Sequence, residues 1–175
     1  MLATRPALGG KVEPNEPKRK PTINKPSDSM SKIIPTISSG TAGPLGVLHL
    51  PRLWQKASLA AVGKLQDDYP AAGSGFDQMV LDGIGIDRQE FLDYISAEKP
   101  TYTACEAWVL SKKGGALDQG TVATLNASIV GYNHDDSTRS SILGSVGRAD
   151  DGSVLDAIGL NNLDDWHCFH QQEIA

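Results

Sequence analysis

The sequence has few cysteines and no long apolar run, and these two absences exclude several classes of protein. Only two cysteines, Cys105 and Cys168, occur in 175 residues, and they form no C-x-x-C pair. This number is too small for a disulfide framework and fits a reducing cytoplasm. No apolar run approaches the roughly 18 residues of a membrane-spanning helix, and the beginning, Met-Leu-Ala-Thr-Arg-Pro, lacks the apolar core of a signal peptide. We therefore expect a cytoplasmic protein with no membrane partner.

The alternation that marks β-strands is also absent. No segment alternates apolar and polar residues for long enough to predict a strand, and no internal repeat is present. The Gly-x-Gly patterns at 73–75 and 83–85 follow no expected strand, so they do not indicate a nucleotide site. Apolar residues instead recur at helical spacing in short segments. The sequence therefore predicts an all-α fold, a compact bundle of short helices.

Basic residues become scarce after the first 32 positions. Residues 1–32 hold seven Lys and Arg against three acidic residues, and the remainder holds nine against eighteen. An acidic domain argues against a nucleic-acid partner. Seven of the ten prolines fall in residues 1–44, a density that excludes helix interiors and central strands. We expect 1–44 to be a basic Pro-rich arm, extended or disordered and able to join a homo-oligomer, and 45–175 to be a single helical domain.

Apolar periodicity and capping residues locate the expected helices. Asp87 with Glu90, and Thr103 with Glu106, have the spacing of capping boxes. A proline at the first helical position, as at Pro51, is favourable because its missing N–H would have no partner there. The helices expected from these signals cover about 51–65, 76–82, 87–98, 103–112, 118–130, 137–147 and 163–173.

The stretch 40–65 is the first candidate for a functional site. A Gly-rich turn brings His49, Arg52 and Lys56 to the start of the first expected helix, and Arg52 and Lys56 share one face because they are four residues apart. With Trp54 they form a candidate pocket wall that is both aromatic and cationic. An aromatic carboxylate fits a planar, bidentate guanidinium. The alternative is that Arg52 and Lys56 pair with acids such as Asp67, Asp68 or Asp77 and only hold helices together.

Two other groups of residues are candidates for acid/base chemistry. Tyr69 and Asp77 flank the loop after the first expected helix, although they can also be a packing residue and a helix cap. His167 and His170, near Trp166, lie on the last expected helix, and histidine titrates near neutrality. A structural role for both histidines is the alternative, and a metal site completed by His134 or Asp135 is another. Their spacing is far weaker than an H-E-x-x-H signal.

The sequence of the central stretch resembles that of a known family. The sequence is similar to small bacterial lyases that act on 4-hydroxylaminobenzoate, within a broader bacterial domain family of unassigned function. The similarity is carried by Ile-Ile-Pro-Thr-Ile-Ser-Ser-Gly-Thr-Ala-Gly-Pro-Leu-Gly from Ile33, Leu50-Pro51-Arg52 with Lys56, Gly63-Lys64-Leu65 with Asp68-Tyr69, Phe76-Asp77, and Gly85-Ile86-Asp87 with Glu90-Phe91-Leu92. The resemblance implies conversion of 4-hydroxylaminobenzoate to protocatechuate with release of ammonia, in the degradation of nitroaromatics such as 4-nitrobenzoate. This conversion involves no net redox change, so it requires no nicotinamide or flavin. We expect no cofactor and assign no residue to a metal.

The chemistry of such a reaction suggests roles for the candidate residues. Arg52, helped by Lys56, would anchor the substrate carboxylate, and Trp54 or Trp166 would stack on the ring. His49 or Tyr69 would be the acid, with Asp77, His167 or His170 as the base. Two other readings stay open: a non-enzymatic helical adaptor whose Pro-rich arm docks a partner, and a metal-dependent hydrolase. The hydrolase would use three histidines, namely His134, His167 and His170.

Overall fold

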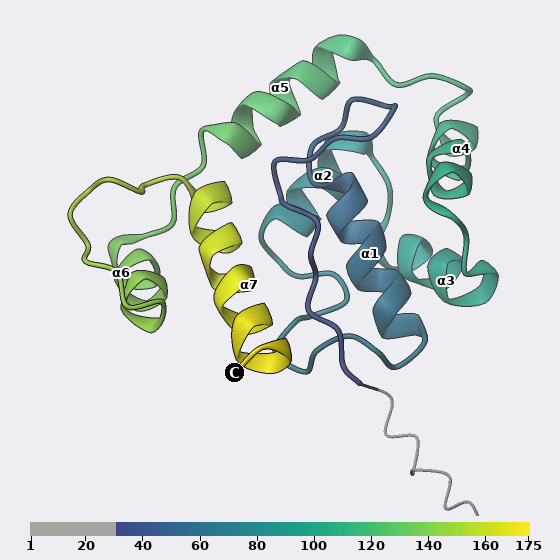
Figure 1. Cartoon of the computed structure of the whole chain (residues 1–175). Helices are drawn as coiled ribbons and strands as arrows, with labels where there is room; N and C mark the ends of the chain where they lie inside the picture. The colour runs from purple at the N-terminus through teal and green to yellow at the C-terminus, as the bar shows by residue number, and fades with distance from the viewer. Residues whose placement is uncertain (1–30) are drawn as a thin grey trace, which may run out of the picture.

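The computed structural model describes residues 31–175, and within this range the chain forms seven α-helices and no strands (Figure 1). The all-α prediction is thus confirmed for the described residues. The part of the predicted arm before residue 31 lies outside them. The helices are α1 (Leu50–Ala61), α2 (Phe76–Ile84), α3 (Arg88–Glu98), α4 (Tyr102–Lys112), α5 (Gln119–Val130), α6 (Asp136–Ser145) and α7 (Ala157–Glu173).

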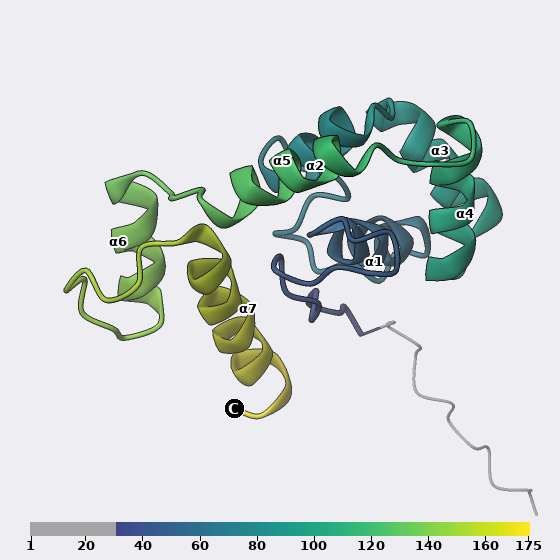
Figure 2. The same cartoon turned by 90° about the horizontal axis from the view of Figure 1, so that it is seen from above.

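Helix α1 lies at the centre of the packing. Leu50, Leu53 and Ala57 recur at i, i+3 and i+7 and are buried on one face of the helix. Helices α2, α3 and α4 contact α1, and α2 also packs along α5 (Figure 2). Because the other face of α1 carries Arg52 and Lys56, also buried, the same helix supplies both the apolar core and a polar site.

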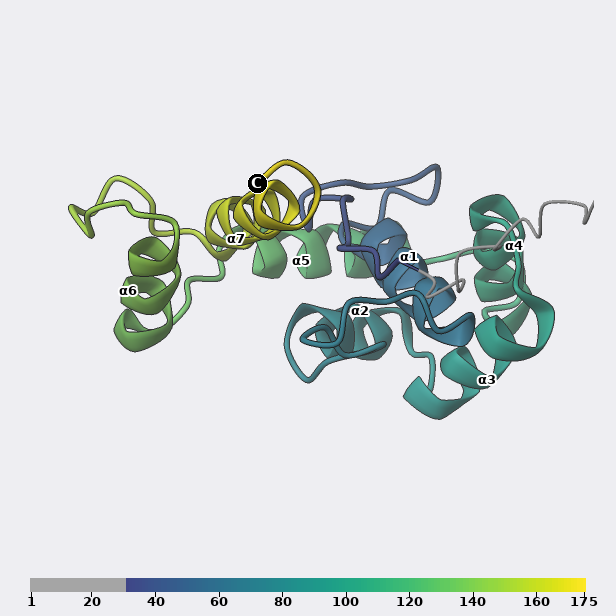
Figure 3. The same ribbon diagram turned by 60° about the horizontal axis from the view of Figure 1, so that its bottom comes forward.

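Helices α6 and α7 form a pair at the end of the molecule opposite α3 and α4 (Figures 1 and 3). The segment before α1 runs between α1 and α7 and is held by both sides (Figure 1). Arg52 on α1 donates a hydrogen bond to the carbonyl of Ile37, and Gln172 on α7 donates one to the carbonyl of Lys32. The last residues of the expected arm therefore pack on the domain, with Ile34 buried.

The first and the last helix have bounds that differ from the expected ones. The first helix ends at Ala61, not near residue 65, because the chain turns at Gly63 with a φ of 69°. The last helix begins at Ala157, six residues earlier than expected, and is capped by Asp156. The predicted cap at Asp87 is confirmed, since it accepts a main-chain N–H of its helix. Asp118, where the next but one helix was expected to begin, caps α5 in the same way.

The predicted capping box of Thr103 and Glu106 is wrong. Thr101 is the N-cap of α4, and its hydroxyl accepts the N–H of Ala104. Glu106 is instead buried and accepts the N–H of Leu45 at 3.1 Å and the hydroxyl of Tyr102 at 2.8 Å. Glu106 therefore fixes the turn that leads into α1.

No helix within residues 31–175 has both the length and the apolar character needed to cross a membrane.

The contact between α2 and α5 gives a stability prediction. A Cβ added at Gly83 would lie 2.7–3.1 Å from three atoms of the buried Leu125 side chain, whereas one added at Gly144 in α6 meets nothing within 4 Å. We expect Gly83→Ala to lower the free energy of unfolding by about 1 kcal/mol, because overpacking outweighs the gain in helix propensity. Gly144→Ala should leave it unchanged or raise it. Urea denaturation measures both, and a stabilised Gly83→Ala variant would contradict the close contact.

Candidate functional site

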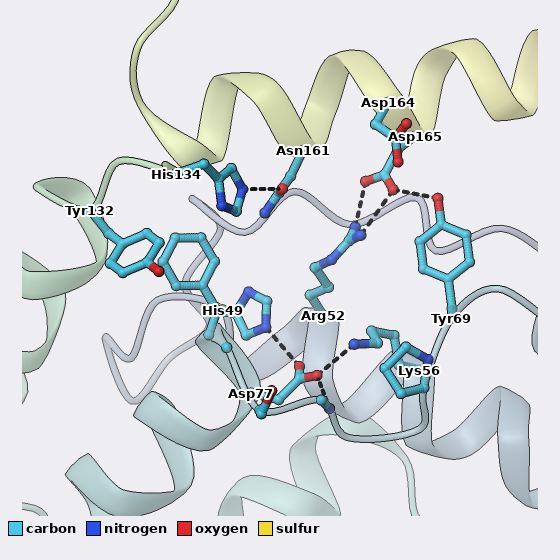
Figure 4. A pocket seen from close by; sticks show the side chains of 15 residues that line it. His49, Arg52, Lys56, Tyr69, Asp77, Tyr132, His134, Asn161, Asp164 and Asp165 are labelled. Carbon is cyan, nitrogen blue, oxygen red and sulfur yellow. Dashed lines mark hydrogen bonds and ion pairs between the residues drawn. The ribbon is translucent and has the colours of Figure 1, made fainter. Parts of the chain in front are cut away.

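A cavity of about 340 Å³ lies between α1, the beginning of α2 and α7, at the lower end of the range for small-molecule sites (Figure 4). The loop before α2 and the segment before α6 close its sides. Most of its lining is polar or aromatic: His49, Arg52, Lys56, Tyr69, Pro70, Gly73, Ser74, Gly75, Phe76, Asp77, Tyr132, His134, Asn161, Asp164 and Asp165.

His49 occupies an unusual backbone position at the entrance to α1. Its φ of 65° lies in the left-handed region, where a non-glycine residue is uncommon and costs of order 1 kcal/mol or more. Pro51 follows in the first turn, and the N–H of His49 is bonded to the carbonyl of Thr41. This turn directs the imidazole inward, where it is 3% exposed and packs edge-on against the ring of Phe76 at 5.4 Å.

The Asp77 carboxylate gathers three donors in the wall of the cavity. Its Oδ1 is 2.8 Å from Nε2 of His49, and its Oδ2 accepts Nζ of Lys56 at 2.5 Å and the N–H of Gly73 at 2.6 Å. Burial by itself would raise the pKa of Asp77, but the hydrogen bond from His49, together with the charge and hydrogen bond of Lys56, outweighs this effect and lowers the pKa to about 2. Asp77 is therefore ionised, and both of its carboxylate oxygens accept hydrogen bonds from the protein.

The His49 imidazole is neutral at pH 7 and has one nitrogen to spare. Burial lowers its pKa below 6.5 and outweighs the opposing effect of Asp77. A neutral imidazole beside an ionised carboxylate donates its proton to that carboxylate, which places the N–H on Nε2 and a lone pair on Nδ1. Nδ1 is buried and has no hydrogen-bond partner among the described residues. A group able to accept a proton therefore lies in the cavity wall.

A second buried ion pair joins α1 to α7. Arg52 donates two hydrogen bonds to Asp165, from Nη1 to Oδ2 at 2.6 Å and from Nη2 to Oδ1 at 2.9 Å. Nη1 also donates to the carbonyl of Ile37. Tyr69 donates its hydroxyl to Oδ1 of Asp165 at 2.9 Å, and burial together with this carboxylate raises the pKa of Tyr69. Both cations of α1 are thus paired. For Lys56 the partner is Asp77, one of the three acids expected, and for Arg52 it is Asp165, which was not expected.

Asp164 is a cavity residue that the sequence analysis missed. Burial, followed by the charge of the neighbouring Asp165, raises its pKa above the ordinary value for aspartate. The cavity thus holds one carboxyl with a lowered pKa, Asp77, and one with a raised pKa. Such divergent environments are typical of acid/base sites. No local sequence signal marks Asp164 as a cavity residue, because only the fold brings the last helix close to α1.

The aromatic wall of the cavity comes from Phe76 and Tyr132. Their rings meet edge to face at 5.4 Å, and Tyr132 continues the row to His134 at 5.9 Å. His134 is fixed in turn by Asn161, with 3.0 Å between Nε2 and Oδ1. These residues, which the sequence analysis did not select as ring contacts, give the cavity its apolar side.

Four residues of the expected site lie away from this cavity. Trp54 donates its indole N–H to the carbonyl of Pro100, and Trp166 is 63% exposed on α7. His170 is also exposed, and His167 lines a neighbouring groove along α7, which shares Tyr69 and Asp164 with the cavity. The other five expected residues, His49, Arg52, Lys56, Tyr69 and Asp77, converge on the cavity.

The three histidines of the hydrolase alternative are not assembled as ligands. Among residues 31–175, no group of three or more His, Cys, Asp or Glu side chains is arranged to hold a metal ion.

Comparison with known proteins identifies a family for most of the chain. Residues 37–159 match a family model described as a domain of unknown function, DUF5069. No curated protein matches the chain. The matched range includes His49, Arg52, Lys56 and Asp77 but ends within α7, before Asp164 and Asp165.

Breaking the buried pair of Arg52 and Asp165 should destabilise the fold. Their side chains are only 6% and 7% exposed, so Arg52→Ala leaves a buried carboxylate unpaired and should lower the free energy of unfolding by about 3–5 kcal/mol. The double variant Arg52→Met with Asp165→Leu should recover most of this loss. Lys112→Ala, which breaks an exposed pair with Glu90, should cost less than about 1 kcal/mol. A change as small for Arg52→Ala would contradict the bracing role.

The lowered pKa of His49 predicts a loss of stability on acidification. Below pH 6.5 His49 becomes protonated in the unfolded chain, while in the folded chain it resists protonation. The unfolded state therefore binds more protons, and the free energy of unfolding decreases as the pH is lowered. As the pH is lowered through 6.5, His49 contributes a slope of up to about 1.4 kcal/mol per pH unit. His49→Gln should flatten the profile measured by urea denaturation. His170→Gln, a matched change at an exposed position, should not, and identical profiles for both variants would refute the assignment.

Proposed function

The chain belongs to the DUF5069 family of domains of unknown function, and we propose that this member is an enzyme whose active site is the cavity between α1, α2 and α7. The observation that carries the proposal is the buried, neutral imidazole of His49, oriented by Asp77 and with Nδ1 unpartnered among the described residues. An imidazole oriented by a carboxylate is a recurrent general base in enzymes.

On the basis of the sequence resemblance, we propose that the reaction is the conversion of 4-hydroxylaminobenzoate to protocatechuate and ammonia. The overall balance consumes one water and leaves oxidation state unchanged. In the first step an acid protonates the hydroxylamine oxygen, and the N–O bond breaks as water departs. A second water then adds at the ring carbon ortho to nitrogen. Hydrolysis of the resulting imine by a third water releases ammonia, and loss of the ring proton restores the aromatic ring.

His49 is the proposed base for the attacking water. Nδ1 accepts the proton while the imidazolium that forms is stabilised by Asp77 through Nε2. Asp77 is a positioning residue and not the base, since its pKa is held near 2 and its oxygens already accept three hydrogen bonds. Lys56 is a positioning residue as well, because its charge keeps Asp77 ionised.

Asp164 is the proposed acid. Burial and Asp165 raise its pKa, so it retains a proton to a higher pH than an ordinary aspartate. Tyr69 is poorly suited to this role, because its hydroxyl proton is donated to Asp165 and its own pKa is raised.

Cavity size and lining support a substrate with a single aromatic ring. The volume of about 340 Å³ is small, and Phe76 with Tyr132 offers two aromatic rings for packing. Arg52 and Lys56 remain the proposed anchor for the carboxylate. Each already serves a protein carboxylate, so the substrate would share these cations and gain less from them than from unpaired ones.

The decisive assay is ammonia release from 4-hydroxylaminobenzoate by the purified protein, with protocatechuate identified as the other product. His49→Gln keeps a donor for Asp77 but loses the basic nitrogen, so kcat should fall about 10²- to 10⁴-fold. Asp164→Asn removes the acid and should cause a similar loss.

The matched controls are His170→Gln and Asp93→Asn, which make the same changes at residues away from the cavity. Both should retain wild-type kcat. Absence of ammonia with the wild-type protein would refute the lyase proposal, and full activity in His49→Gln would refute the role of the imidazole.

A further inference from the structure

Asn126 lies inside α5 but uses its side chain outside the helix. Asparagine is a poor helix former, because its side chain competes for main-chain hydrogen bonds. Here the amide binds the turn before α1, at residues 43–48. Oδ1 accepts the N–H of Leu48 at 3.0 Å, and Nδ2 donates to the carbonyl of Gly46 at 2.7 Å. Both ends of the amide therefore bind a segment that is 78 and 80 residues away in sequence.

The two peptide groups that Asn126 binds lie on either side of Val47 and lead directly into His49. Val47 is fully buried, so apolar packing fixes where the turn lies. Hydrogen bonds to the carbonyl of one peptide and the N–H of the next also fix how these groups are rotated, because such bonds are directional. The following N–H, that of His49, is bonded to the carbonyl of Thr41 at 3.0 Å. The chain thus enters His49 in one orientation.

This orientation matters because the backbone of His49 is in a sparsely populated conformation. A φ of 65° at a residue other than glycine persists where the surrounding structure enforces it. The same conformation directs the side chain inward, where Nε2 lies 2.8 Å from Oδ1 of Asp77. Relaxation of the turn to a negative φ would swing the imidazole away from this carboxylate.

We propose that Asn126 is a positioning residue for His49, whose amide holds the turn before α1 in the conformation that keeps the imidazole on Asp77. Asn126 does not line the cavity, so it would act through the main chain alone. Glu106 on α4 accepts the N–H of Leu45 and so binds the same turn from a second helix. The catalytic meaning of this inference rests on the proposed function, in which His49 is the base.

Nitrogen NMR of the histidine rings follows the imidazole without any turnover. In the wild type, the signals of His49 should show a proton on Nε2, none on Nδ1 and a pKa below 6.5, because burial outweighs the effect of Asp77. The charged groups that act on this ring are Asp77 from α2 and Arg52 and Lys56 from α1. Loss of the signals in His49→Gln identifies them.

Asn126→Ala removes both hydrogen bonds and leaves a better helix former in α5. With the turn released, the ring should populate both tautomers, and its pKa should rise toward 6.5 as it becomes more exposed. Asn126→Asp keeps an acceptor for the N–H of Leu48 but places a carboxylate beside the carbonyl of Gly46. It should move the signals in the same direction, and it carries the test if Asn126→Ala does not fold.

The matched control is Asp118→Ala, a change at the beginning of the same helix. Asp118 caps α5 by accepting the N–H of Thr121 at 2.7 Å. Its loss should lower the midpoint of urea denaturation, as the loss of Asn126 should, but the signals of His49 should stay as in the wild type. Equal shifts in Asp118→Ala and Asn126→Ala would show a response to lost stability and would overturn the positioning role.

The ammonia assay gives a second readout. Asn126→Ala should lower kcat about tenfold to a hundredfold with little change in KM, because a base displaced by about 1 Å no longer meets its reactant. In a His49→Gln background the same change should cause no further loss, since the two residues act as a unit.

The outcomes separate this inference from the lyase proposal. Wild-type signals of His49 in the folded Asn126 variants would overturn the inference, whether or not the protein releases ammonia. An equal further loss of kcat in the His49→Gln background would overturn it as well. Signals that shift in the Asn126 variants and not in Asp118→Ala, in a protein that forms no ammonia, would support the positioning of the imidazole and reject the lyase.

Discussion

The burial of the Asp77 carboxylate is the constraint on which the site depends. An ionised carboxylate removed from water is expensive unless charged and hydrogen-bonding groups surround it. Here the three donors come from α1, from the turn before α1 and from the loop before α2. Satisfying one charge therefore fixes the relative positions of all three segments. It also sets the protonation of the imidazole, since the Nε2 proton is committed to Asp77 and Nδ1 is left as the basic atom.

The ion pair of Arg52 with Asp165 fixes the position of α7 relative to α1, as the contacts of Asp77 fix that of α2. Helix α7 faces α1 across the cavity, and this bidentate pair, extended by Tyr69, joins them. Bidentate pairing restricts both distance and angle, so α7 is held in one orientation. That orientation brings Asp164 and Asn161 into the cavity wall. A residue that was expected to bind substrate thus also builds the wall from which the proposed acid comes.

Local signals predicted much of the fold and about half of the site. Asp87 with Glu90 indicated the beginning of its helix because capping is decided within a few residues. His49, Arg52 and Lys56 were found because a short stretch at the beginning of one helix places them together. Asp165 was not found, since it lies 113 residues from Arg52 and on its own resembles any helical acid. Trp54 was misjudged because a tryptophan beside two cations has the same sequence pattern whether it faces the cavity or packs elsewhere.

The electrostatics of the cavity suit proton transfer better than strong capture of anions. Each cation of α1 has a protein carboxylate as partner, so an anionic ligand meets ion pairs and gains little net attraction. A neutral imidazole and a carboxyl group with a raised pKa, by contrast, can each take part in proton transfer without first losing a strong partner. These electrostatics therefore fit the proposed reaction, in which protons move, better than the capture of a ligand that brings a charge with it.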